Sequence, residues 1–190
     1  MKLFIDITGV IWVVFWLYWL ISAVMTRSGT ERKGGFPFPV GFVILIVAAL
    51  VLLGSGSGTD DFLLSRFVPD VPYVAVAGIL ITAAGLLFAV WARVHLGRNW
   101  SGRPMIKVGH QLIRTGPYRY VRNPIYTGIL IGFIGTVLVL GLWIAVLAAG
   151  VGLVAFLGKI RVEEKLLLEK FGEEYVQYKR EVKSLIPFVL

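Results

Sequence analysis

The sequence contains no cysteine and only two histidines, His95 and His110, among its 190 residues. Without cysteine the chain has no disulfide framework, no thiolate nucleophile and no cysteine-ligated metal site. Two histidines are too few for a histidine-rich metal site. The sequence also lacks a GxGxxG motif after a strand, a P-loop and a GxSxG elbow. These absences argue against metal, thiol, Rossmann-type and serine-hydrolase functions.

Hydrophobic residues make up 57% of the chain, more than is usual for a soluble domain. They occur in long blocks, which predicts an all-α integral membrane protein. The first block is longer than a signal-peptide core, so we expect a retained helix. The blocks predict one domain over residues 1–190 with about five transmembrane helices, at residues 3–25, 38–54, 72–94, 125–140 and 142–158.

The 33 residues of 125–157 carry no charge. A straight helix of that length would extend ~50 Å, which exceeds the ~30 Å hydrocarbon core. We therefore expect a hairpin of two short helices that turns near Gly141. The basic segment 93–124 should lie in the cytoplasm, and the hairpin returns the tail, 159–190, to that same side.

Segment 93–124 holds seven Lys or Arg residues and no Asp or Glu. Pro117 and Pro124 disfavour helical geometry in the residues before them, so part of this segment should be an ordered loop. Its tyrosines add flat surfaces with a polar tip. The composition fits a pocket for a ligand with negative charge and an apolar or aromatic body. A juxtamembrane basic loop that only sets topology would explain it as well.

The tail should form an amphipathic helix over residues 159–182. Its apolar residues recur at spacings of four and three, namely Leu167, Phe171, Tyr175, Tyr178 and Val182. Glu163 and Glu164 fall one turn earlier, where the helix leaves the membrane. An interfacial helix that binds anionic membrane lipid is the alternative. With loop 95–124 on the same side, the two polar segments predict a cytoplasmic pocket.

Three segments together resemble the isoprenylcysteine carboxyl methyltransferase family of integral membrane enzymes. The first is LGRNWS at residues 96–101. The second is GHQLIRTGPY at 109–118, which continues as RNPIYTG at 122–128. The third is RVEEKLL at 161–167, followed by FGEEYVQY at 171–178. Their order and spacing match the family over about half of the chain.

The resemblance implies a helical pocket that holds S-adenosylmethionine, releases S-adenosylhomocysteine and admits a lipidated substrate from the bilayer. The substrate carboxylate would be held by Lys159 or Arg161, the two candidates for a catalytic role, with Asn99 and Trp100 also on the substrate side. The residues implied for the cofactor are His110, Gln111, Leu112, Ile113, Gly116, Tyr118, Arg122, Asn123, Pro124, Ile125, Tyr126, Glu163 and Glu164.

Asn123 departs from the family pattern, which usually has histidine at this position. Asparagine can donate a hydrogen bond to a carboxylate, but it carries no charge. The cofactor would then be held by Arg122 or Arg119, or bound weakly, or the substrate would differ. Asn123 would also suit a plain turn before proline.

Three functions are compatible with this pattern. Methylation of a carboxylate needs only two reactants held in line and water excluded, because the carboxylate is already ionised. Methylation of an amine, as in phospholipid N-methyltransferases, requires a base, for which Glu163, Glu164 and His110 are candidates. A non-catalytic membrane protein that binds anionic lipid is the third. None of them calls for nucleic acid or a metal, and the sequence does not identify the methyl acceptor.

Overall fold

The computed structural model describes residues 1–25, 62–100 and 111–187. Apart from one isolated bridge, the regular elements in these ranges are helices, which confirms the all-α prediction. The predicted span at 38–54 lies outside the described residues. The elements are α1 (Lys2–Met25), η1 (Phe62–Leu64), α3 (Pro72–Leu96), η2 (Gly97–Asn99), η3 (Gly116–Arg119), α4 (Pro124–Leu140), α5 (Trp143–Phe171) and α6 (Glu173–Glu181).

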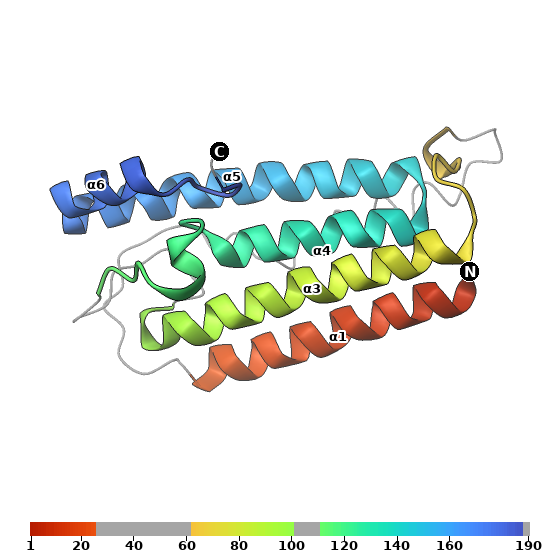
Figure 1. Cartoon of the computed structure of the whole chain (residues 1–190), viewed down its shortest axis with the longest axis horizontal. Coiled ribbons are helices and arrows are strands. Elements are labelled where there is room, and N and C mark those ends of the chain that lie inside the picture. Colours follow the sequence, from red (N-terminus) through yellow and green to blue (C-terminus); the bar gives the residue numbers. More distant parts are fainter. Residues whose placement is uncertain (26–61, 101–110, 188–190) are drawn as a thin grey trace.

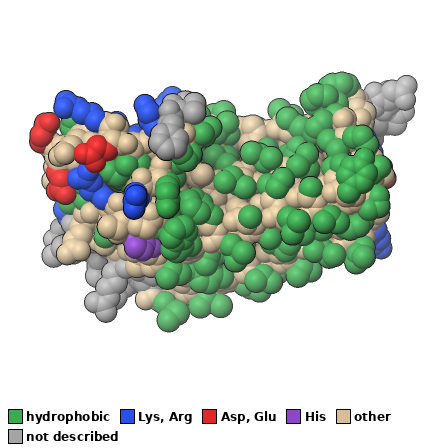
Figure 2. Space-filling model, viewed as in Figure 1, with side chains coloured by type: hydrophobic (Ala, Val, Ile, Leu, Met, Phe, Trp, Pro, Cys, Tyr) green, Lys and Arg blue, Asp and Glu red, His purple; other side chains and the backbone are tan. Residues whose placement is uncertain are grey.

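The long helices lie side by side in an elongated bundle, in the order α1, α3, α4 and α5 (Figure 1). Helices α1, α3 and α5 are long and apolar enough to cross a membrane, and α4 is a shorter apolar helix. Figure 2 shows hydrophobic side chains along most of the bundle and charged side chains gathered at the end that holds α6. This division supports a membrane-spanning body with one polar end.

Small residues allow α3 and α4 to approach closely. A methyl group added at Gly85 would lie 2.6 Å from the carbonyl oxygen of Gly128. One added at Gly135 would lie 2.4 Å from the carbonyl oxygen of Gly78. Such contacts between small residues are a common way for membrane helices to associate. This interface fixes the start of α4, where the second motif lies, against the end of α3.

Helices α4 and α5 form a hairpin that turns at Gly141, as expected, but α5 has 29 residues and is longer than the predicted short helix over 142–158. Helix α4 ends at Leu140, and Gly141 takes a left-handed conformation with φ 66° that suits glycine. The turn is also held from outside the hairpin. Arg66 donates to the carbonyl oxygen of Leu140 at 3.1 Å, and the amide of Phe67 donates to that of Gly141 at 2.9 Å.

The tail differs from the predicted single helix over 159–182. Helix α5 runs without interruption from the apolar hairpin into the polar segment and ends only at Phe171, where the next residue, Gly172, has a φ of 52°. The change from apolar to charged residues near Lys159 alters the surroundings of the helix but not its backbone, so the helix continues. After the short helix α6 the chain returns to α4, where the amide of Asn123 donates to the carbonyl oxygen of Ser184 at 3.0 Å.

Candidate active site

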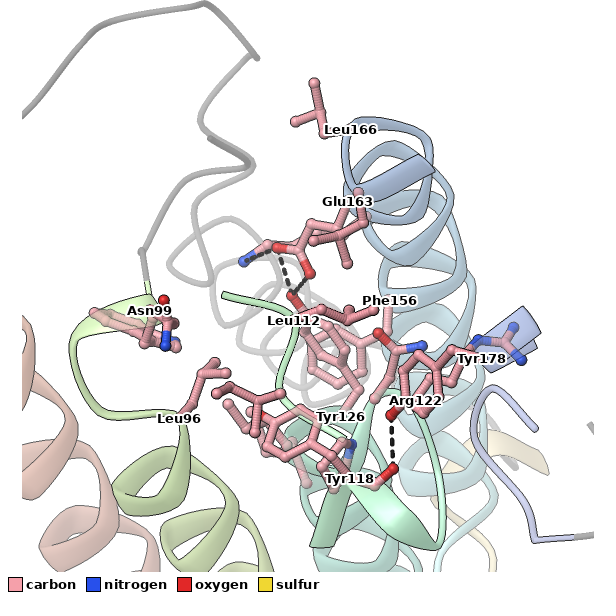
Figure 3. A pocket seen from close by; sticks show the side chains of 18 of the residues that line it. Leu96, Asn99, Leu112, Tyr118, Arg122, Tyr126, Phe156, Glu163, Leu166 and Tyr178 are labelled. Atoms are coloured by element: carbon pink, nitrogen blue, oxygen red, sulfur yellow. Dashed lines mark hydrogen bonds and ion pairs between the residues drawn. The ribbon is translucent and has the colours of Figure 1, made fainter. Parts of the chain in front are cut away.

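A cavity of about 330 Å³ lies at the charged end of the bundle (Figure 3). Its volume is in the range of small-molecule sites. Walls come from α1, the end of α3, segment 111–113, η3 and helices α4, α5 and α6. Its polar and tyrosine lining consists of Asn99, Gln111, Tyr118, Arg122, Asn123, Tyr126, Lys159, Glu163, Tyr175 and Tyr178.

Glu163 brings a carboxylate to the cavity wall. The hydroxyl of Tyr126, on α4, donates to both carboxylate oxygens at 3.0 and 2.9 Å. Lys159 lies one turn earlier on α5, with its ammonium nitrogen 3.9 Å from Glu163 and 5.6 Å from the centre of the Tyr126 ring. A carboxylate, an ammonium group and a phenol therefore meet where α4 faces α5.

The neighbouring Glu164 has a different position. Successive residues of a helix point about 100° apart, so Glu164 faces the tail rather than the cavity. One of its oxygens accepts from the guanidinium of Arg122 at 3.0 and 2.9 Å, and the other lies 3.2 Å from the ammonium of Lys179. Glu164 thus joins α5 to the start of α4 and to α6.

The hydrogen-bond donors of Arg122 and Asn123 also bind at this junction between α5, the start of α4 and the tail. The Nη1 group of Arg122 donates to the carbonyl oxygen of Val182. The side-chain amide of Asn123 donates to Glu164 at 3.2 Å and to the hydroxyl of Ser184 at 3.0 Å. Asparagine at position 123 therefore holds the returning tail against α4, a task that needs hydrogen-bond donors but no charge.

Tyrosines close the cavity on the side of α6. Tyr178 donates its hydroxyl to the carbonyl oxygen of Tyr118 at 2.6 Å. Burial raises the pKa of Tyr178, and burial reinforced by the nearby Tyr178 raises the pKa of Tyr118. Both phenols therefore stay neutral and able to donate at physiological pH. Tyr175 is almost fully enclosed, at 1% exposure.

An aromatic wall faces the polar groups. Trp16 and Trp19 of α1 line the cavity together with Trp100, and the rings of Trp19 and Trp100 meet edge to face with centroids 5.7 Å apart. Four of the aromatic lining residues are not among those predicted from the sequence, namely the pair Trp16 and Trp19 and the pair Tyr175 and Tyr178. Their spacing of three residues within each pair places each pair on one helix face, which is the signal that could have found them.

Most residues predicted for the site line this cavity. In the described part of the chain the lining does not include three of them. Gly116 packs against His95, where an added methyl group would lie 2.7 Å from the imidazole. Glu164 joins the tail to α4, and Arg161 is exposed on α5. His110 lies outside the described residues. The predicted residues that do line it are Asn99, Trp100, Gln111, Leu112, Ile113, Tyr118, Arg122, Asn123, Pro124, Ile125, Tyr126, Lys159 and Glu163.

Curated proteins with similar sequences are methyltransferases. Protein-S-isoprenylcysteine O-methyltransferase of Schizosaccharomyces pombe is 38% identical over 81 residues, which cover 42% of this chain and 34% of the relative. A probable enzyme of the same name from Oryza sativa subsp. japonica is 33% identical over 120 residues, covering 62% and 63%. Methanethiol S-methyltransferase of Mycobacterium tuberculosis is 36% identical over 91 residues, covering 47% and 35%.

These alignments span about a third to just under two thirds of the relatives' length. The fold has a solved counterpart, the structure of the eukaryotic intramembrane Ras methyltransferase, isoprenylcysteine carboxyl methyltransferase. It superimposes with a TM-score of 0.65 at 20% identity, over 88% of this chain and 60% of that one. A family model described as phospholipid methyltransferase matches residues 73–174. That match covers more than half of the sequence. Together with the isoprenylcysteine O-methyltransferase relatives, it confirms the resemblance seen in the sequence. The chain belongs to the phospholipid methyltransferase family.

Proposed function

We propose that the protein is a methyltransferase that uses S-adenosylmethionine to O-methylate a carboxylate on a prenylcysteine-like or other lipophilic substrate. One observation carries this proposal. A single cavity combines the Glu163–Tyr126 pair and Lys159 on one side with a tryptophan wall on the other. The names of the curated relatives support the same reaction.

The lining fits the chemical groups of S-adenosylmethionine. The Glu163 carboxylate can accept hydrogen bonds from ribose hydroxyls or from an ammonium group, and the ring faces of Tyr118 and Tyr126 suit an adenine or a sulfonium. When bound, this cofactor supplies a methyl group that is already activated: its carbon–sulfur bond breaks as a carbon–oxygen bond forms, leaving S-adenosylhomocysteine. The protein needs only to align the reactants and exclude water.

Lys159 is the residue we assign to the acceptor carboxylate. Arg122 also lines the cavity, but its donors are engaged by Glu164 and the tail carbonyls. Among the described residues, the ammonium of Lys159 lies 3.9 Å from Glu163 and 5.6 Å from the Tyr126 ring centre, too far for a hydrogen bond, so it can turn toward a second carboxylate. The exposed Arg161 is too far round the helix for this role. The basic residues at this end favour a cytoplasmic orientation.

The test is calorimetric titration of the purified protein in detergent with S-adenosylhomocysteine. We expect saturable one-to-one binding that is lost in Glu163→Ala and Tyr126→Ala. Transfer of a labelled methyl group to N-acetyl-S-farnesylcysteine should follow. Absence of binding to protein whose circular dichroism shows intact helices would overturn the proposal.

Methylation of an amine is the second candidate, because the matching family is described as phospholipid methyltransferase. Glu163 is the described lining residue that could take up the proton an amine must lose. Phosphatidylethanolamine offered in the same transfer assay distinguishes the two. Methylation of this lipid, without methylation of the farnesylcysteine compound, would replace carboxylate transfer by amine transfer.

A further inference from the structure

A buried arginine lies directly behind the aromatic wall of the cavity. Arg93, in the last turn of α3, is 3% exposed. Its guanidinium carbon lies 4.1 Å from the ring centre of Trp100, so the cation covers one face of the indole. The cavity lining includes Trp100 but not Arg93. Arg93 can therefore act on the cavity through the ring that it supports.

The edges of the same guanidinium bind two separate parts of the backbone. One terminal nitrogen donates to the carbonyl oxygen of Gly97 at 3.2 Å, at the start of the turn that leads to Trp100. The other donates to the carbonyl oxygen of Ser22 at 3.2 Å, near the end of α1. Arg93 thus fixes α1, the η2 turn and the Trp100 ring relative to one another.

These contacts determine the shape of the wall. Trp19 and Ala23 of α1 line the cavity on either side of Ser22 in sequence, and Trp19 meets Trp100 edge to face. Arginine suits this place because its planar group bonds along its edges while an aromatic ring covers its face. Lysine has no planar fork, and methionine donates no hydrogen bond, so neither can make all three contacts.

The part of the chain next to Trp100 lies across the cavity from Glu163, the carboxylate assigned to the cofactor. Figure 3 shows Leu96, at the end of α3, and Asn99, of η2, on one side of the cavity and Glu163 of α5 on the other. Helix α1 also lies outside the family match, which begins at residue 73. We propose, on the basis of the proposed function, that Arg93 is a positioning residue. It holds Trp100 and the end of α1 in place, and these form the surface that binds the apolar body of the acceptor.

The test compares the acceptor with the cofactor in Arg93→Lys and Arg93→Met. In full-length protein in detergent, both variants should raise the KM for N-acetyl-S-farnesylcysteine, roughly threefold to thirtyfold for methionine, as expected from loss of a cation–π contact. The kcat at saturating acceptor and the Kd for S-adenosylhomocysteine should stay unchanged. If Arg93 only stabilised the fold, its loss would not raise the KM for the acceptor while leaving the Kd for S-adenosylhomocysteine unchanged.

Two further variants separate positioning from a general loosening of α1. Thr136→Val breaks the 2.9 Å hydrogen bond from Trp12 that fastens α1 to α4 away from the cavity lining, and it should leave the acceptor KM unchanged. Trp100→Leu should raise that KM and reduce the additional effect of Arg93→Met, because the two residues act through one contact. If Arg93→Met fails to fold, Arg93→Lys and Trp100→Leu carry the test.

The other possible results of these experiments also support or overturn the role proposed for Arg93. An unchanged acceptor KM in an active Arg93 variant, or an equal loss of affinity for acceptor and S-adenosylhomocysteine, would overturn it while the proposed function stands. If wild-type protein transfers no methyl group but quenching of its tryptophan fluorescence shows that it binds the farnesylcysteine compound, Arg93→Met must still weaken that binding. Wild-type protein that neither binds nor methylates it, although it binds S-adenosylhomocysteine, would overturn the inference and leave the cofactor assignment standing.

Discussion

The hydroxyl of Tyr126 donates to both carboxylate oxygens of Glu163, and this contact joins α4 to α5 at the cavity wall. The contact orients the carboxylate that we assign to the cofactor. Glu163→Gln should therefore weaken binding of S-adenosylhomocysteine about tenfold to hundredfold, as expected for hydrogen bonds to a charged group. Calorimetric titration measures the change.

The matched control is Glu169→Gln, which removes the same charge from an exposed position on the same helix. It should leave the Kd for S-adenosylhomocysteine unaltered. Equal losses in the two variants would mean that general electrostatics, rather than a contact in the cavity, explains the effect of Glu163.

Glu164 is expected to affect stability more than binding. Glu164→Gln leaves the guanidinium of Arg122 facing an amide inside a largely enclosed junction, where both side chains are about a tenth exposed. Breaking such a pair by removing one charge costs roughly 3–5 kcal/mol. We expect a clearly lower midpoint in thermal unfolding followed by circular dichroism, with less loss of S-adenosylhomocysteine affinity than in Glu163→Gln. A larger loss of affinity would instead place Glu164 at the cofactor.

The different positions of Glu163 and Glu164 show what could not be predicted from the sequence. Local chemistry was enough to predict the hairpin, because a long uncharged run and Gly141 leave few alternatives. The division of roles between Glu163 and Glu164 depends on which side of α5 faces α4 and which faces the returning tail. That is settled by contacts over tens of residues, such as the bond between Arg122 and Glu164. The place of Trp19 in the cavity depends on such contacts as well.

Close approach of α3 and α4 should make Gly135 intolerant of a side chain. A methyl group in Gly135→Ala would lie 2.4 Å from both the Gly78 carbonyl oxygen and the Thr82 hydroxyl, so the helices must separate. Overpacking of this kind costs roughly 1–3 kcal/mol. Thermal unfolding in detergent should show the loss. Gly150→Ala is the matched control, because its methyl group meets nothing within 4 Å, and similar midpoints for the two variants would contradict the interface.

Alkaline pH should loosen the α6 side of the cavity. Burial raises the pKa of Tyr178 from its ordinary value of 10.0, so the folded protein keeps this proton to a higher pH than the unfolded chain does. The resulting stabilisation is complete below about pH 10 and is lost as pH rises further, through the folded-state pKa. Thermal midpoints measured from pH 9 upward should fall less steeply in Tyr178→Phe than in the wild type. Parallel curves would show that Tyr178 does not titrate differently on unfolding.

Lys159 and Arg161 offer a direct comparison, because they lie two residues apart on α5 but only Lys159 lines the described cavity. If Lys159 pairs with the acceptor carboxylate, Lys159→Met removes a charge-assisted contact, which is worth roughly tenfold to hundredfold in affinity. The KM for N-acetyl-S-farnesylcysteine should rise by that factor, whereas Arg161→Met should change it little. The methyl ester of the same compound, which lacks the carboxylate, should bind wild type and Lys159→Met equally well. A rise in KM in Arg161→Met but not in Lys159→Met would transfer the acceptor contact to the exposed face of α5.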